Sequence, residues 1–210
     1  MRPRTANGKS QKKPAGFDFT AHMKAIVHDM VERLPELSHI DLSRVAFAFG
    51  QARKKTHYGI HASLTPMRFE DGSRTTIKRG SEYMCRQLFD ADGQEMLYIL
   101  TFYLPRFMDV VFDEKLVTIL HELWHISPQF NGDIRRHPGR CYAHTHSQKE
   151  YDEGMKVLAD KWLAMNPAEE LYAFLRCDFH SLQKGHGQVW GTKIPHPKMI
   201  RIGQPRPQTA

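Results

Sequence analysis

Two histidines and a glutamate interrupt the most apolar helical segment of this chain. They form the motif His121-Glu122-Leu123-Trp124-His125, and seven of the eleven residues from Leu116 to Ile126 are apolar. Asp113 and Glu114 precede this run and suit the first turn of a helix. Helix residues four apart lie on one face, with Cβ atoms roughly 5–6 Å apart. The segment is therefore predicted to be a buried helix that must provide partners for two imidazoles and one carboxylate.

The pattern H-E-x-x-H favours a zinc site. In this interpretation His121 and His125 bind one zinc ion, and Glu122 acts as the general base that takes a proton from zinc-bound water. The alternative is a pair of hydrogen-bonded core histidines, with Glu122 paired to an arginine. That alternative leaves three polar groups to be satisfied separately, whereas one metal ion satisfies them together. We therefore favour zinc.

Length and composition predict one soluble domain with short tails. The chain has 210 residues, of which 40% are hydrophobic, enough for one ordinary core. The first ten residues lack the apolar core of a signal peptide, and Pro105 and Asp109 interrupt the apolar region from Met96 to Phe112. The cysteines are odd in number and widely spaced, which argues against a disulfide framework or a zinc ribbon: Cys85, Cys141 and Cys177. We expect a reducing, cytoplasmic location.

The net charge of +7 is concentrated at the ends of the chain. Residues 1–16 and residues 179–210 each carry five lysines and arginines and no acid. Such ends are usually solvated, but they can also make weak contacts with nucleic-acid phosphates. We predict a disordered basic tail over residues 1–16, a domain over residues 17–185, and a basic extension over residues 186–210 that packs on the domain or trails from it.

Hydrophobic periodicity predicts an α+β order of elements. A first helix begins near Phe19 and ends at Pro35, and the motif helix lies in the middle of the chain. Two helices follow, one behind the capping box Ser147–Glu150 and one that begins with Asn166 as cap and continues to Leu182. Strands are expected at residues 44–49, 58–66, 75–78 and 95–104, and short extended pieces at 188–190 and 199–202.

A catalytic zinc takes three protein ligands and leaves its fourth position to water, so a third ligand has to follow the motif. The metzincin spacing would place it at Asn131, a poor ligand, with Pro128 at the glycine position, which excludes that subclass. We favour His144, because the long loop from Ser127 to Tyr142 gives the chain room to return over the metal. The other candidates are His137 and His146 and, less favoured, Asp133, Glu150 and Glu153.

The run from Leu116 to Asp152 resembles bacterial and phage metallopeptidases of the zincin group, relatives of the SprT-like and YgjP-like minimal zincins. The resemblance is strongest in Leu-Val-Thr-Ile-Leu-His-Glu-Leu-Trp-His-Ile-Ser-Pro, Asn-Gly-Asp-Ile-Arg-Arg, Tyr-Ala-His and Ser-Gln-Lys-Glu-Tyr-Asp. It implies a helix, a small sheet, an active-site helix with His121, Glu122 and His125, and a later histidine as third ligand. The C-terminal zinc ribbon of SprT-like proteins is absent from this sequence.

The sequence thus predicts a zincin-like α+β domain with a small, mostly antiparallel sheet. Its expected function is zinc-dependent hydrolysis of a protein or peptide substrate, with Glu122 as base and Tyr142 as a candidate donor to the oxyanion. Three alternatives remain open: a nucleic-acid-associated zinc protein, a SprT-like protease acting on DNA-bound proteins, and an inactive zincin fold that serves as an interaction module.

Overall fold

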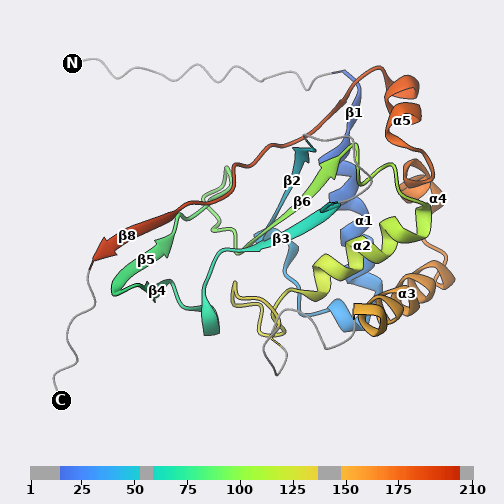
Figure 1. Ribbon diagram of the computed structural model, residues 1–210. Coiled ribbons are helices and arrows are strands. Elements are labelled where there is room, and N and C mark those ends of the chain that lie inside the picture. The colour runs from blue at the N-terminus through green and yellow to red at the C-terminus, as the bar shows by residue number, and fades with distance from the viewer. Residues whose placement is uncertain (1–14, 53–58, 137–147, 204–210) are drawn as a thin grey trace, which may run out of the picture.

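The computed structural model describes residues 15–52, 59–136 and 148–203, with the backbone alone for 148–152. The described part of the chain has five α-helices and three small sheets, which confirms the predicted α+β class (Figure 1). None of these helices is both long enough and apolar enough to cross a membrane. The predicted basic tail, the histidines at 137, 144 and 146, and the capping serine at 147 lie outside the described residues, apart from positions 15 and 16 of the tail.

The central sheet has the strand order β2 (Val45–Gln51), β6 (Tyr98–Leu104) and β3 (Ala62–Pro66). Strand β6 runs parallel to β2 and antiparallel to β3. The predicted small, mostly antiparallel sheet is found as three separate sheets: in the described part of the chain three of the five strand pairs are antiparallel, and the central β2–β6 pair is parallel. Hydrophobic alternation reports which face of a strand is buried but not the direction of its neighbour. The long connection from β3 to β6 lets the chain re-enter the sheet parallel to β2.

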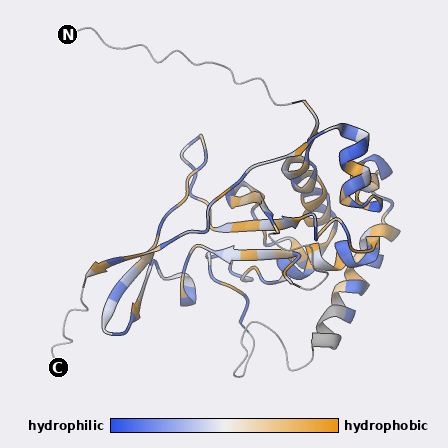
Figure 2. Cartoon of the chain, turned by 45° about the horizontal axis from the view of Figure 1, so that its top comes forward, coloured by the Kyte–Doolittle hydropathy of each residue, from blue (hydrophilic) through white to orange (hydrophobic). Residues whose placement is uncertain are grey.

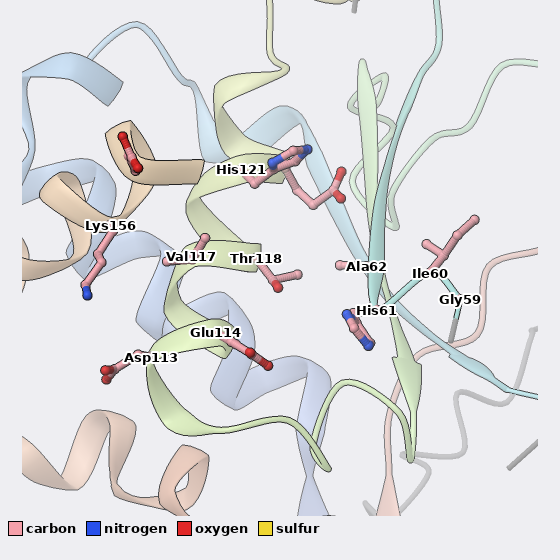
Figure 3. A pocket seen from close by; sticks show the side chains of 12 residues that line it. Gly59, Ile60, His61, Ala62, Asp113, Glu114, Val117, Thr118, His121 and Lys156 are labelled. Atoms are coloured by element: carbon pink, nitrogen blue, oxygen red, sulfur yellow. The ribbon is translucent and has the colours of Figure 1, made fainter. Parts of the chain in front are cut away.

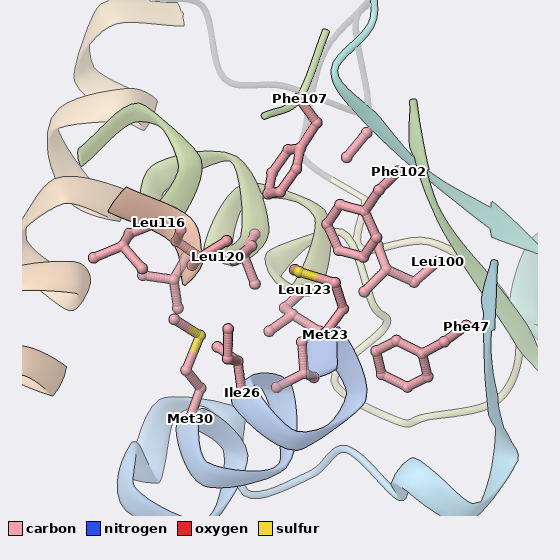
Figure 4. Packing of buried hydrophobic residues seen from close by; sticks show 14 of the residues in the cluster. Met23, Ile26, Met30, Phe47, Leu100, Phe102, Phe107, Leu116, Leu120 and Leu123 are labelled. Carbon is pink, nitrogen blue, oxygen red and sulfur yellow. The ribbon is translucent and has the colours of Figure 1, made fainter. Parts of the chain in front are cut away.

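Two helices cover one face of the central sheet (Figures 1 and 4). Helix α1 (Phe19–Arg33) begins after Asp18, whose side chain accepts a hydrogen bond from the Ala21 N–H at 3.1 Å. It ends at Arg33, with Leu34 as its C-cap, because Pro35 cannot continue the hydrogen-bond ladder. Its buried stripe packs in one core with side chains of α2 and of the two central strands: Met23, Ile26, Met30, Phe47, Leu100, Phe102, Leu116, Leu120 and Leu123.

Helix α2 (Phe112–Trp124) carries two stripes of opposite character. Leu116, Ile119, Leu120 and Leu123 are buried, at the helical spacing that points one face toward the core. The same spacing places Thr118, His121, Glu122 and His125 on another side, where all four are partly exposed. The helix ends one residue before His125, which is its C-cap and retains right-handed helical backbone angles. The motif is therefore on the last turn of this helix.

The region after α3 (Gln148–Ala164) departs from the prediction. In place of one helix from 166 to 182 there are α4 (Glu169–Tyr172), a 3-10 turn (Ala173–Arg176) and α5 (Phe179–His186). Asn166, expected to cap the helix, has a left-handed φ of 51°. The break is stabilised by the buried Lys115, whose Nζ donates to the carbonyl oxygens of Leu175 and Cys177, each at 2.7 Å.

The remaining strands form two peripheral sheets. Strand β1 (Phe17–Asp18) pairs in parallel with β7 (Val189–Trp190). Strands β4 (Thr75–Lys78), β5 (Ser81–Cys85) and β8 (Met199–Gly203) form an antiparallel sheet with β5 in the middle, which we call the outer sheet. It projects from the side of the molecule away from the helices and carries both hydrophilic and hydrophobic residues (Figures 1 and 2).

Candidate metal and catalytic site

The structure brings the two motif histidines together at the end of α2. The ring centroids of His121 and His125 are 4.7 Å apart, and the ring planes are inclined at 80°. Both side chains are partly exposed, whereas the leucine between them, Leu123, is fully buried. The burial of the leucine stripe therefore fixes the helix rotation that presents both imidazoles to one side.

Glu122 lies between this pair and the edge strand of the central sheet. Its Oε2 accepts a hydrogen bond from the Leu64 N–H of β3 at 2.7 Å. Burial raises the pKa of the Glu122 carboxyl to about 7, although the hydrogen bond from Leu64 acts in the opposite direction. A carboxyl with a pKa in this range can both accept and return a proton near neutral pH.

Strand β3 directs alternate backbone groups toward α2. Strand β3 is antiparallel to β6, and the Tyr103 N–H donates to the His61 carbonyl while the Met67 N–H donates to the Leu97 carbonyl. In this register the backbone groups of the odd-numbered residues of β3 form hydrogen bonds to β6. The N–H groups of Ala62 and Leu64 therefore point away from β6, and Glu122 accepts from the second of them. This edge of the sheet is the one nearest to the motif.

A cavity of about 1050 Å³ opens beside the motif (Figure 3). Glu114 and Thr118 of α2 point into it toward β3 and toward His61, which directly precedes β3. Asp113 lies on the opposite side of the helix, nearer to α3. The described residues that line it come from α2, α3, β3 and the segment before β3: Gly59, Ile60, His61, Ala62, Asp113, Glu114, Val117, Thr118, His121, Glu122, Glu153 and Lys156. The cavity is large enough for several residues of an extended peptide.

His61 and Leu64 belong to this site, although the motif did not point to either. The Nε2 of His61 is buried and has no hydrogen-bond partner in the described part of the chain. Burial lowers the pKa of His61, the Arg106 guanidinium lowers it further, and the Glu114 carboxylate opposes both effects. His61 falls inside the strand predicted at residues 58–66. The alternation of polar His61 with apolar Ala62 in that strand was the only sequence feature that could have indicated His61. The contribution of Leu64 comes from its backbone, which no side-chain pattern reports.

The loop after α2 holds the end of that helix in place. The Arg135 Nε donates to the Trp124 carbonyl at 2.8 Å, and its guanidinium lies 4.2 Å from the centre of a Trp124 ring. The buried Tyr98 hydroxyl accepts from the Gly132 N–H at 3.0 Å and donates to the Asp133 carbonyl at 2.8 Å. Gly132 has a φ of +89°, and a Cβ there would lie 2.4 Å from the Arg68 Cγ. The loop backbone is therefore closely specified.

Two of the acids considered as third ligands differ in their surroundings. The Asp133 carboxylate is buried and bonded to Arg136 and to the backbone N–H groups of Asp71 and Ile134, so it acts in the loop. Glu153 lines the cavity together with His121. His144, His137, His146 and Tyr142 lie outside the described residues, as does the side chain of Glu150.

The described donors suit a zinc ion in kind but supply only part of a ligand set. Two neighbouring imidazoles are ligands that zinc prefers, and the adjacent carboxyl matches the H-E-x-x-H arrangement. Over residues 15–52, 59–136 and 153–203, no three histidine, cysteine, aspartate or glutamate side chains are grouped closely enough to hold a metal ion. Comparison of the chain with protein-family models, curated proteins and solved structures found no match.

Proposed function

We propose that this chain is a zinc-dependent metallopeptidase, in which His121 and His125 are zinc ligands and Glu122 is the general base. The observation that carries the proposal is the contact of the two imidazoles at 4.7 Å, with the Glu122 carboxyl beside them on the same helix end. His121 and Glu122 border one open cavity, which gives a substrate access to them. A hydrogen-bonded pair of core histidines would not require such a cavity.

The chain's own residues divide the chemistry between them. A bound zinc ion would supply a Lewis acid that polarises a carbonyl group and lowers the pKa of water. Glu122 takes the proton from the attacking water and returns it to the leaving amine, for which a pKa near neutrality is suited. The Leu64 N–H fixes one carboxyl oxygen of Glu122, so the orientation of this base is set by the edge of the sheet.

The edge of β3 is the proposed seat of the substrate backbone. The outward N–H and C=O groups of Ala62 lie in the cavity wall, and an extended peptide can add to such an edge as a further strand. A peptide placed there would pass alongside Glu122, because β3 and this carboxyl are already in hydrogen-bond contact. Protein segments without tertiary structure are therefore the substrates that we propose.

His144 remains our proposed third ligand, with His137 and His146 as the alternatives. All three come from the segment that follows the α2 loop, and α3 follows them in sequence and packs along α2. Glu153 on α3 is the described alternative, because it borders the same cavity as His121.

The test is hydrolysis of an unfolded protein such as casein by the zinc-loaded chain. Glu122→Gln should abolish cleavage, because the amide cannot accept a proton. The zinc content and the thermal unfolding midpoint of this variant should remain close to those of the folded, zinc-loaded wild type. Glu170→Gln is the matched control, since Glu170 is an exposed carboxylate that does not line the cavity. Equal cleavage by the Glu122 variant and the wild type would refute the mechanism. A folded chain that takes up no zinc would indicate the inactive interaction module instead.

A further inference from the structure

Charge is strongly segregated between the outer sheet and the rest of the described chain. The two segments that form the sheet, residues 74–86 and 198–203, carry six lysines and arginines and one acid. The remaining described residues carry 14 lysines and arginines and 22 acids. Strand pairing therefore joins two basic segments that are more than 100 residues apart in sequence, and it places them together on a projecting part of an otherwise acidic body (Figure 1).

The strand register separates the two faces of the outer sheet. Thr76, Tyr83 and Arg201 lie opposite one another on the three strands and therefore share a face. Lys78 is two residues beyond Thr76 and lies on the same face. The single acid of the sheet, Glu82, pairs with Ile77 on the other face. One face thus presents an aromatic ring on the middle strand between two cations.

Three cations of this sheet are exposed and have no acidic partner within the described residues. Lys78 ends β4, Arg79 lies in the turn to β5 with a φ of 51°, and Arg201 lies in β8. All three are exposed, and no salt bridge is formed by any of them in the described part of the chain. By contrast, Arg68 and Arg74 beside the base of the sheet are paired with Glu95. The outer cations are thus available to an external anion.

We propose that this face binds single-stranded nucleic acid, with phosphates on Lys78, Arg79 and Arg201 and a base stacked on Tyr83. Basic side chains that follow a backbone, interleaved with an aromatic ring, are the combination that single strands require. An unpaired base is needed, because the π-face of a paired base is covered within its duplex.

An anionic membrane fits this surface less well. Binding to a bilayer combines cations with apolar side chains directed to the same side. Here the exposed isoleucines Ile77 and Ile200 share the face opposite to Lys78 and Arg201, and Met199 adds one exposed apolar side chain to the basic face. A flat membrane could contact only one of these two faces, whereas a nucleic acid needs only the basic one. The proposal uses no residue of the zinc site and stands or falls independently of peptidase activity.

The test uses the full chain and a fluorescent oligothymidylate of about 12 nucleotides, within the site size of a small single-strand binding fold. Fluorescence anisotropy measured over a range of salt concentrations gives the affinity and its salt dependence. Lys78→Ala combined with Arg201→Ala should lower the slope of log K against log salt by about 1.4, since each single-strand phosphate contact contributes about 0.7. Lys24→Ala with Lys184→Ala is the matched control. It removes two exposed lysines from α1 and α5 and should leave the slope unchanged.

Tyr83 provides a second and independent measurement. Tyr83→Leu should weaken binding at least about fivefold, whereas Tyr83→Phe should keep the wild-type affinity, because stacking requires the ring and not the hydroxyl. If the Lys24/Lys184 double variant lost as much binding as the Lys78/Arg201 double variant, the proposal would be overturned. Binding would then depend on the net charge of the chain and not on this face. Preference for the duplex of the same length, or binding only to anionic phosphatidylserine vesicles, would overturn it as well.

Discussion

Replacing Glu122 by glutamine is expected to change how the stability of the metal-free chain depends on pH. Burial raises the pKa of the Glu122 carboxyl from its ordinary value of 4.5 to about 7. The folded chain therefore holds this proton more tightly than the unfolded chain does. The stability that the group contributes is complete below pH 4.5 and is lost as pH rises through 7. Because each pKa unit corresponds to about 1.4 kcal/mol, the full loss is about 3 kcal/mol, and most of it falls between pH 5 and pH 8.

Glutamine removes this titration and retains the local geometry. Its side-chain oxygen can still accept from the Leu64 N–H, and no charge has to be buried at any pH. Relative to the variant, the wild-type chain should therefore lose about 2–3 kcal/mol of unfolding free energy between pH 5 and pH 8.

The measurement is urea unfolding followed by tryptophan fluorescence, in a chelator, at several pH values from 5 to 8. Glu114→Gln should follow the wild type, because this carboxylate lies at the exposed beginning of the same helix. Parallel pH profiles for Glu122→Gln and the wild type would show that the folded state does not raise the pKa of this carboxyl, and the reasoning from burial would fail.

Three further outcomes test the site and the loop that supports it. Elemental analysis after reconstitution at neutral pH should find one zinc per wild-type chain and well under half a zinc in His121→Ala, since a lone imidazole binds zinc weakly. Among the histidines of the following segment, His144→Ala should weaken zinc affinity more than His137→Ala or His146→Ala, measured by competition with a chromophoric chelator. Tyr98→Phe should lower the unfolding free energy by about 1–3 kcal/mol in urea titrations, because the Gly132 N–H and the Asp133 carbonyl lose their buried partner.

Regular periodicity made the two core helices predictable, whereas long-range pairing was not. The leucine stripe of α2 specified both its helix and the side on which His121 and Glu122 lie. Strand β5 was missed because Ser81–Cys85 shows no apolar alternation, and its place depends on β4 and β8 on either side. The single helix expected after Asn166 was wrong because Lys115, about 60 residues earlier, takes two carbonyls that a continuous helix would use. No local pattern contains that information.

The contact between Glu122 and β3 could not be predicted from the sequence, because it too depends on long-range strand pairing. A glutamate in H-E-x-x-H indicates a base, but the motif does not show what orients the base. Here the orienting group is the Leu64 N–H, and its availability depends on which residues of β3 bond to β6. The sequence therefore indicated the side chains of the proposed zinc site and not the backbone donor that contacts one of them.

The buried ammonium of Lys115 implies that distant parts of the chain open together. It anchors the start of the motif helix to the carbonyls of Leu175 and Cys177, at the junction between the 3-10 turn and α5. Neither side can detach without leaving a lysine charge and two carbonyl groups unsatisfied in a site that is only 2% exposed. In native-state hydrogen exchange, the amides of α2 and those of the 3-10 turn should then share one opening free energy and form a single cooperative unit.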